Sequence, residues 1–442
     1  MENAAGAAMA GGEGVIIPHR TQMSAGSNAV CIVTAGTIQS SPRVVREAAM
    51  LSDNGFDVKV ACRTEHGVSQ ILSAEDVRLE FAGKSTAPCE VGKPKLAARV
   101  RYAFERYGYG ALSDFILPPV SAVIAGGAEL QQRLNTVEAD IYVGHGVAGL
   151  VAAATTARRR GRPWAFDAED FHTGEMRDDQ WPIGRKPIFR SIERRLIPGC
   201  AYVTAASPGI SRAYCDAYRI DPPAVVLNLP LATPEHVEPR SPVLVGPSIF
   251  WISQTIGPNR GLECAVRAIG AAKTRPHLYL QGHITSRFQA ELTDIAAGAN
   301  CGDRLHVLLS CSPQAADLAP LGYDIGFCGE PGFCFNNEIA LSNKLFAFLQ
   351  CGLALVARDT SAHRGLAAEI GEAIMIYRRE DAADLARVFD ELLEKPERLA
   401  RAKAASRALM TAQFDWDNQA QVILTLISQG LGPLDYAPPT HV

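Results

Sequence analysis

The chain has 442 residues, of which 47% are hydrophobic and 20% are charged, and its formal net charge is −4. This composition is typical of a soluble globular protein, and the length predicts two or three domains rather than one core. A nearly neutral chain lacks the broad basic surface that nucleic acid requires, so nucleic acid is excluded as the main partner.

Neither a membrane span nor a secretory leader is expected from the sequence. No apolar run reaches the roughly 18 residues that a span needs, and the N-terminus lacks the basic-then-apolar pattern of a signal peptide. The 11 cysteines are scattered without a Cys-x-x-Cys pair. They predict reduced thiols in a cytoplasmic protein, not a disulfide framework or a zinc site.

The first part of the chain alternates short β-rich runs with helical ones. Residues 1–27, rich in Ala, Gly and Met, predict a flexible tail. The alternation that follows is typical of parallel sheets covered by helices, and it predicts a Rossmann-like domain over residues 28–230. A helix is expected over 42–52, and strands are expected over 29–36, 57–62, 77–81, 140–143, 163–166, 201–205 and 224–227.

The second part repeats this alternation after a proline-rich stretch. Residues 231–246 predict an extended linker and a hinge. Residues 247–410 predict a second α/β domain, with helices from Gly261 and Asn343. Its strands are expected over 248–253, 277–281, 304–309, 324–327, 353–358 and 373–377. Residues 411–442 hold a C-terminal helix and tail, and this helix is a candidate to pack back across the hinge.

Residues 93–134 combine basic and large apolar side chains. Lys93, Lys95, Arg99, Arg101 and Arg106 stand among Leu, Val, Tyr and Phe. A helix of this kind can lie on an anionic membrane surface. A solvated helix face laced with salt bridges is the plainer interpretation. Peripheral contact with the inner membrane face therefore stays an alternative at this stage.

Two cations stand where an anionic group could bind. Ser342, Asn343 and Lys344 begin an amphipathic helix, whose N-terminus offers unpaired N–H groups and a partial positive charge. Arg260 lies with Gly257 in the loop after the first strand of the second domain, at the sheet edge where α/β proteins bind ligands. Its planar fork suits a diphosphate. A simple helix cap and a surface arginine are the plain alternatives.

An acidic cluster, Asp167, Glu169 and Asp170, follows a strand of the first domain. Paired carboxylates can hold a divalent cation. This cluster lies away from the expected donor loops, however, so no metal site is expected. Acceptor binding, acceptance of a proton from an acceptor hydroxyl, and capping of the next helix by Asp170 all remain open.

A dinucleotide site is the main rival interpretation. Residues 144–149 fit G-x-G-x-x-G, follow a strand and open a helix, and Asp167 stands about twenty residues later. This pattern would place NAD in an oxidoreductase. Against this interpretation, the strand and helix that carry the motif come after other strand–helix units of the same domain, whereas dinucleotide cofactors usually bind at the first strand–helix unit.

Taken together, residues 29–428 resemble the GT-B glycosyltransferases, specifically the family 4-like (group 1) enzymes. No single motif is diagnostic, but their order and spacing are fairly specific. The matching segments are 41–48, 139–145, 167–170, 193–197, 226–230, 260–262, 278–282 and 342–346.

The resemblance implies two Rossmann-like, doubly wound domains facing across a cleft. The second domain would bind a nucleoside diphosphate sugar, and the first would bind a glycan, lipid-linked or small-molecule acceptor. Transfer would proceed with retention and with no cofactor or metal, as in polysaccharide biosynthesis. Arg260 and Lys344 would neutralise the leaving diphosphate, and His145 would touch the donor sugar. Arg43, Asp167 and Asp170 are assigned to the acceptor side.

The chain departs from the family in the helix that begins at Asn343. Related enzymes carry a glutamate there to hold the ribose, and this chain has Ala347. The family also customarily has two glutamates eight residues apart. Glu338 does not form such a pair with a later residue, because the residue eight positions after it is Phe346. Glu338, Ser342, Asn343 and Gly257 are still assigned to donor binding. Ribose recognition must come from elsewhere, or the protein is a non-catalytic sugar-nucleotide binder.

Overall fold

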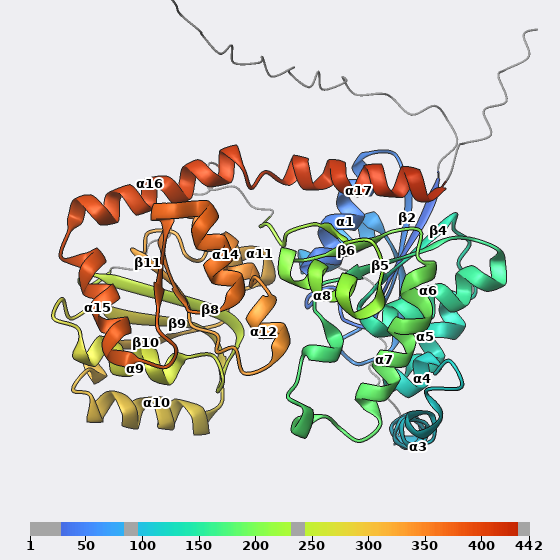
Figure 1. Ribbon diagram of the computed structural model, residues 1–442, viewed down its shortest axis with the longest axis horizontal. Coiled ribbons are helices and arrows are strands. Elements are labelled where there is room, and N and C mark those ends of the chain that lie inside the picture. The colour runs from blue at the N-terminus through green and yellow to red at the C-terminus, as the bar shows by residue number, and fades with distance from the viewer. Residues whose placement is uncertain (1–27, 84–95, 231–243, 432–442) are drawn as a thin grey trace, which may run out of the picture.

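A computed structural model describes residues 28–83, 96–230 and 244–431, and shows two α/β domains side by side (Figure 1). The predictions of a tail over 1–27 and of a linker over most of 231–246 lie outside the described residues. No helix in the described ranges is long and apolar enough to cross a bilayer. Every cysteine in those ranges is a free thiol.

The first domain is built on a seven-stranded sheet of order β3-β2-β1-β4-β5-β6-β7. Only the β2–β3 pair is antiparallel. The strands are β1 Ala29–Thr34, β2 Asp57–Arg63, β3 Ser69–Ser73, β4 Ile141–His145, β5 Trp164–Ala168, β6 Val203–Ala205 and β7 Ala224–Val225. The helices are α1 Pro42–Asp53, α2 Ala74–Phe81, α3 Leu96–Leu112, α4 Val120–Val123, α5 Gly127–Leu134, α6 Gly146–Arg160, α7 Arg185–Leu196 and α8 Pro208–Tyr218.

The second domain is built on a six-stranded parallel sheet of order β10-β9-β8-β11-β12-β13. The strands are β8 Ser248–Ile256, β9 His277–Ile284, β10 Leu305–Leu308, β11 Ile325–Cys328, β12 Ala354–Arg358 and β13 Ile374–Tyr377. The helices up to the last strand are α9 Leu262–Ala271, α10 Ser286–Gly298, α11 Pro313–Ala316, α12 Phe335–Ile339, α13 Asn343–Gln350 and α14 Ser361–Ile370. Three more follow it: α15 Ala382–Leu393, α16 Pro396–Ala412 and α17 Trp416–Leu431.

Both sheets are covered by helices on both faces, because alternate side chains of a strand point to opposite sides. In β8, Ile249 and Trp251 belong to one buried cluster while Phe250 and Ile252 belong to the other. The strands of the first sheet divide in the same way between two clusters. This is the doubly wound arrangement that the alternating sequence predicts.

One expected strand is wrong. Residues 77–81 belong to helix α2, because Ser73 and Asp76 form a capping box in which each side chain accepts a hydrogen bond from the other residue's backbone N–H. The strand at this position is β3, immediately before that cap. A capping box at the start of an apolar run is a helix signal that outweighs the β-branched Val77.

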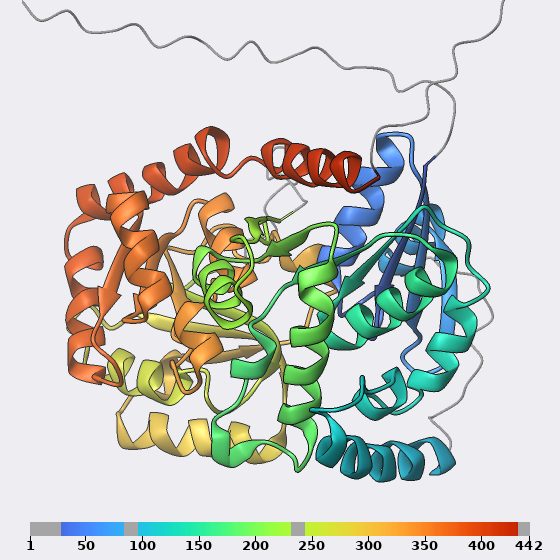
Figure 2. The same ribbon diagram turned by 45° about the vertical axis from the view of Figure 1, so that its right-hand side comes forward.

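The C-terminal helix crosses from the second domain to the first, as the sequence suggested. Helix α16 packs on α13, and the chain then continues along the same edge of the molecule into α17 (Figures 1 and 2). Ala420, Ile423 and Ile427 of α17 are buried in a core cluster of the first domain. The Gln419 side chain accepts a hydrogen bond from the Leu227 backbone N–H at 2.8 Å. Helix α17 thus ties the two domains together.

Candidate functional site

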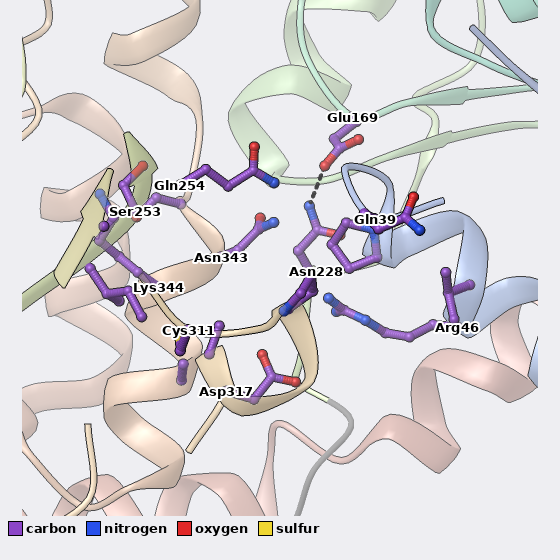
Figure 3. Close-up of a pocket in the computed structure, with 18 of the residues that line it drawn as sticks. Gln39, Arg46, Glu169, Asn228, Ser253, Gln254, Cys311, Asp317, Asn343 and Lys344 are labelled. Carbon is purple, nitrogen blue, oxygen red and sulfur yellow. Dashed lines mark hydrogen bonds between the residues drawn. The ribbon is translucent and has the colours of Figure 1, made fainter. Parts of the chain in front are cut away.

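A cleft of about 810 Å³ lies between the two domains. This volume is in the range of small-molecule sites. One wall comes from the carboxyl ends of the second sheet and from α13, and the other comes from α1 and the loop after β5 (Figure 3). Its position follows the general rule that ligands of open α/β sheets bind beyond the carboxyl ends of the strands.

Lys344 and Arg260 line this cleft together with Ser342 and Asn343. Ser342 is the N-cap of α13, yet its side chain makes no capping hydrogen bond. The start of the helix therefore retains backbone N–H groups that an anion could use. The structure brings these four predicted residues into one wall.

Lys344 is buried, and its surroundings disfavour the charged form of its ammonium group. Burial lowers the pKa of Lys344, and the charge of Arg260 lowers it further. The Lys344 ammonium also lies 4.7 Å from the centre of the Trp251 ring, and it forms an ion pair with Glu330. With this carboxylate in place the pKa of Lys344 is still lowered to about 7. Two cations that repel each other within one cleft form a natural site for a multiply charged anion.

The loop that holds Arg260 has little conformational freedom. Gly261, the N-cap of α9, has a φ of 73°, and a Cβ at this position would lie 2.1 Å from the Gly329 carbonyl oxygen. Strand β8 also has a register irregularity between Ile252 and Thr255, and Ser253 and Gln254 within it line the cleft. Bulges of this kind often redirect side chains next to functional sites.

Two residues assigned to donor binding lie elsewhere. Glu338 is not among the residues that line the cleft, and its carboxylate forms an ion pair with Arg379 at 2.5 Å. Gly257 does not line the cleft either. The assignment of these two residues to donor binding therefore stays a prediction.

Sequence reasoning overlooked Glu330, which stands eight positions before Glu338. The pair of glutamates eight apart that seemed to be missing is therefore present in the sequence, but the structure separates its members. Glu330 lines the cleft beside Lys344, whereas Glu338 faces Arg379. Counting backward from Glu338 would have found it.

His145, Asp167 and Arg43 form a buried charge network in the first domain. Strand register places His145 opposite Asp167, and Asp167 opposite Thr204, at the carboxyl edge of the sheet. Helix α1 adds Arg43 and Glu47, which share a face because they are four residues apart. Arg43 binds Asp167 through two hydrogen bonds of 2.6 Å.

The network occupies both ring nitrogens of His145. Nε2 lies 2.7 Å from Glu47 Oε2, and Nδ1 lies 3.2 Å from Asp167 Oδ2. Burial alone would lower the pKa of His145, but Asp167 and Glu47 raise it to about 10. Burial likewise opposes ionisation of Asp167, yet Arg43 and His145 hold its pKa well below the usual range. These three residues do not line the cleft, so their contact with substrate stays a prediction.

Asp170 lines the cleft and links the two domains. The Asn336 side-chain amide, on α12 of the second domain, donates to Asp170 Oδ1 at 2.6 Å. The Phe171 backbone N–H donates to the Asn336 amide oxygen at 2.7 Å, and Ser207 Oγ donates to the Ile339 carbonyl at 2.7 Å. Burial and the neighbouring charge of Glu169 raise the pKa of Asp170 to about 6. Asp170 thus lies in the cleft at a point where the two domains are hydrogen-bonded to each other.

The glycines of the dinucleotide fingerprint have a packing role. A Cβ on Gly144 would lie 2.5 Å from the Gly149 carbonyl carbon, and one on Gly149 would lie 2.4 Å from the Val33 carbonyl oxygen. These residues let α6 approach the sheet closely. Asp167, the acidic residue of the pattern, is already bound by Arg43, His145 and Thr204. The structure therefore argues against NAD at this position.

Among the residues that the structure describes, no group of three or more His, Cys, Asp and Glu side chains is arranged to hold a metal ion. The acidic residues at the end of β5 and just after it are engaged separately. Asp167 belongs to the buried network, Glu169 accepts a hydrogen bond from Asn228 at 3.2 Å, and Asp170 binds Asn336.

No family model and no curated protein matches the sequence. Solved structures do match the fold. HepE from Anabaena, in complex with UDP and glucose, has a TM-score of 0.63 at 14% identity, over 90% of this chain and 99% of HepE. Sucrose-phosphate synthase from Thermosynechococcus elongatus has a TM-score of 0.64 at 11% identity, over 90% and 98%. A putative UDP-N-acetylglucosamine 2-epimerase from Listeria monocytogenes has a TM-score of 0.54 at 13% identity, over 94% and 100%.

These similarities extend over nearly the whole of each matched structure. The chain has the GT-B fold, two Rossmann-like domains facing across a cleft, as the resemblance implied. At such low identity the likeness defines the fold, and the chemistry has to be argued from the cleft.

Proposed function

We propose that this protein is a glycosyltransferase that moves a sugar from a nucleoside diphosphate donor to a glycan, lipid-linked or small-molecule acceptor. The observation that carries the proposal is the convergence of Arg260, Lys344 and the N-terminus of α13 on one wall of the interdomain cleft. When the bond from the sugar to the diphosphate breaks, negative charge develops on the leaving oxygen. Preorganised cations and backbone N–H groups at that place lower the barrier.

The same residues support transfer without a metal ion. A divalent cation in other transferases neutralises the diphosphate, and here two protein cations and a helix terminus are available for that task. Asp170, on the facing wall, is a candidate to receive the proton of the acceptor hydroxyl, since its raised pKa is closer to neutrality than that of an ordinary carboxyl. Retention of configuration rests on the family resemblance alone.

The fold also occurs in a putative sugar-nucleotide epimerase, so an assay must separate transfer from epimerisation. Thermal shift with UDP, GDP, dTDP, ADP and NAD identifies the nucleotide first, because a ligand that binds only the folded state raises the melting temperature. The sugar released or transferred from the matching donor is then identified by NMR. An unchanged C2 configuration with release of nucleoside diphosphate supports transfer. A free epimer, or a shift with NAD alone, would contradict the proposal.

Variants connect the activity to the cleft. Lys344→Ala and Arg260→Ala are expected to lower turnover by about 10²- to 10³-fold, the usual effect of losing one stabilising donor. Arg267→Ala, an exposed arginine on α9 near Arg260, is the matched control and should keep full activity. A non-catalytic binder would show nucleotide binding that depends on Lys344 but no turnover in any variant.

The exposed face of α3 supports a further part of this proposal, that the enzyme rests on an anionic lipid surface. No residue of α3 is buried, and Figures 1 and 2 show the helix at one end of the first domain. Leu96, Val100 and Phe104 recur every four residues and are 76%, 60% and 81% exposed. They therefore form one apolar stripe along the helix.

Neighbouring residues add exposed apolar surface and charge. The Gly184 turn packs tightly on Gly110 of α3, which brings Ile183, 68% exposed, next to the helix. Arg99 and Arg101 on α3 are exposed as well. Apolar side chains that enter the headgroup region beside arginines that meet lipid phosphates are typical of interfacial helices. Such a position would suit a lipid-linked acceptor.

A further inference from the structure

A second cavity, of about 250 Å³, lies at the carboxyl edge of the first sheet. It is lined by the ends of β1 and β4, by the first residues of α6 and by the loop after β5. The strand order reverses between β1 and β4, because β2 lies beyond β1 on one side and β5 lies beyond β4 on the other. Ligands of open α/β sheets bind at this kind of switch point. The cavity therefore occupies a position where a ligand is expected.

The N-terminus of α6 faces this cavity without a side-chain cap. Residues 146–148, the first three of the helix, all line it. The N-cap residue, His145, makes no capping hydrogen bond, and its ring nitrogens lie against Glu47 and Asp167. Backbone N–H groups of the first turn therefore stay available for a ligand, and the helix dipole places partial positive charge there.

His172 directs an unpaired ring nitrogen toward the same helix start. The residue is only 8% exposed, and it lines the cavity. Its Nδ1 pairs with the Glu175 carboxylate, whereas its Nε2 has no hydrogen-bond partner in the described part of the chain. A Cβ on Gly146 would lie 3.8 Å from both Cε1 and Nε2 of His172, so this edge of the ring faces the first residue of α6. A buried polar atom without a partner is unfavourable, and a ligand that pairs with it would relieve this.

His172 carries a proton on both ring nitrogens at neutral pH. Burial alone would lower the pKa of His172, but Glu175, Glu193 and Asp170 raise it to about 9. A protonated ring has two donors and no acceptor. The ligand atom that meets Nε2 must therefore be a hydrogen-bond acceptor.

The other groups that line the cavity also call for an acceptor. Arg185 adds a second cation, and its buried Nε has no hydrogen-bond partner among the residues described. The carboxylates already have partners: Glu175 pairs with His172, while Glu169 and Asp170 accept hydrogen bonds from asparagine side chains. Unpaired donors that converge with a helix N-terminus suit the oxygens of a phosphate or a carboxylate.

This cavity adjoins the interdomain cleft. Glu169 and Asp170 line both spaces, and Figure 3 shows Glu169 across the cleft from Lys344. A ligand anchored by an anionic group at α6 would extend toward Asp170, on the wall that faces Lys344 and Arg260. Its anionic group would thus stay apart from a diphosphate bound at the other wall.

We propose that this cavity binds a phosphate or carboxylate group of the second substrate, held by His172 Nε2, Arg185 and the N-terminus of α6. The description of this ligand as the sugar acceptor rests on the proposed function, whereas the anion site itself rests on the cavity and its unpaired donors. The inference narrows the acceptor from any glycan, lipid-linked or small molecule to one that carries an anionic group.

Binding of small anions tests the site directly. Inorganic phosphate and acetate are titrated, with NMR of the ligand as the readout, into a parent variant that combines Lys344→Ala with Arg260→Ala. These two changes remove the cations of the other wall, so that binding there does not mask the new site. At least one anion is expected to bind. Tighter binding of phosphate indicates a phosphorylated acceptor, and tighter binding of acetate indicates an acceptor with a carboxylate.

Substitutions at the cavity, made in this parent, locate the bound anion. His172→Asn places an amide near the position of Nδ1, next to Glu175, but removes the donor at Nε2, and should weaken binding about tenfold. His172→Gln places its amide near Nε2 and should weaken binding less. Arg185→Gln should also weaken it. Arg190→Ala, an exposed arginine on the same helix α7 that does not line the cavity, is the matched control and should bind as the parent does.

The outcomes separate this site from the proposed function. Undetectable binding of both anions to the parent, or equal affinity with and without His172→Asn, would overturn the inference. A lower melting temperature in His172→Asn with unchanged affinity would also overturn it, because the ring would then have a structural role only. In the otherwise wild-type enzyme, His172→Asn should raise KM for an anionic acceptor about tenfold and leave KM for the donor unchanged. Absence of transfer from any nucleotide donor would refute the proposed function, but would not alter the anion affinities.

Discussion

Arg43 and Asp167 are joined across the carboxyl edge of the first sheet by two parallel hydrogen bonds, Nε to Oδ2 and Nη2 to Oδ1, each of 2.6 Å. Both side chains are buried, with 7% and 4% of their surface exposed. The remaining guanidinium nitrogen, Nη1, donates to the Val226 carbonyl oxygen at 2.7 Å. Arg43 thus fixes α1 and the chain after β7 to the end of β5.

Loss of the Arg43 guanidinium is expected to destabilise the protein strongly. Arg43→Met leaves Asp167 buried with reduced compensation, which typically costs about 3–5 kcal/mol. The free energy of unfolding is measured by urea denaturation at pH 7. Arg159→Met, an exposed arginine of α6, is the matched control and should change it by less than about 0.5 kcal/mol. A loss below about 1 kcal/mol in Arg43→Met would show that the pair is not structural.

His145 makes the stability of the first domain depend on pH in the alkaline range. Its folded-state pKa is raised from 6.5 to about 10 by Asp167 and Glu47, against the effect of burial. The folded state therefore holds a proton that the unfolded chain releases above about pH 6.5. This contribution is fully present below pH 6.5 and is lost as the pH rises toward 10.

Urea denaturation at pH 6, 8 and 10 measures this effect. The wild-type protein should lose on the order of 3 kcal/mol across this range. His145→Gln should be less stable at pH 6 and should have a flatter profile, because two carboxylates then lack their shared cation. His283→Gln, an exposed histidine, should follow the wild type. Parallel profiles for wild type and His145→Gln would rule out a protonated His145.

Much of the fold could be predicted from the sequence, because alternating apolar runs report directly on strands buried between helices. The strand expected at 77–81 was wrong because the decisive signal there is the local hydrogen bonding of Ser73 and Asp76, which starts a helix. The sequence indicated a helix after the last strand of the second domain, and this made α17 a candidate to pack back on the first domain. Its partners could not be predicted, since they depend on tertiary packing.

The positions of single cations in the cleft could be predicted from the sequence, because a cation next to a helix start or a strand end is visible there, as for Lys344 at the start of α13 and Arg260 after β8. Positions could not be predicted where they depend on which charged side chains contact one another in the folded protein. The resemblance assigned His145 and Asp167, at the ends of two strands, to contact with substrate. Strand register makes them neighbours, and one turn of α1 brings Glu47 to the same point, so that the charges satisfy one another.

Glu330 is expected to set the pH range in which Lys344 binds anions. Burial and the charge of Arg260 lower the pKa of Lys344 to about 7 with Glu330 in place, and in Glu330→Gln the ammonium also loses its carboxylate partner, so this pKa should fall further. Binding of a diphosphate then requires a proton at alkaline pH. Affinity for UDP, measured by calorimetry, should fall about tenfold per pH unit between pH 7.5 and 9 in this variant.

The wild-type protein should show a similar slope, but its affinity should begin to fall near pH 7, the pKa of its Lys344, whereas in Glu330→Gln the fall should begin at a lower pH. Glu330→Gln with Lys344→Gln serves as the control, and should bind weakly at every pH. The same onset of the fall in wild type and Glu330→Gln would show that the carboxylate does not govern the charge of Lys344.

The apolar stripe on α3 predicts membrane contact that single substitutions should abolish. Phe104→Glu places a charge at the most exposed large residue of the helix, and should reduce co-sedimentation with vesicles of phosphatidylglycerol and phosphatidylcholine about tenfold or more. Arg99→Glu with Arg101→Glu should remove the preference for anionic lipid. Both changes affect exposed side chains, so the melting temperature should hardly change. Val245→Glu, at an exposed apolar residue just before β8, is the control and should bind vesicles as the wild type does. If Phe104→Glu retained full vesicle binding, α3 would be a solvated face and the acceptor would have to reach the cleft from solution.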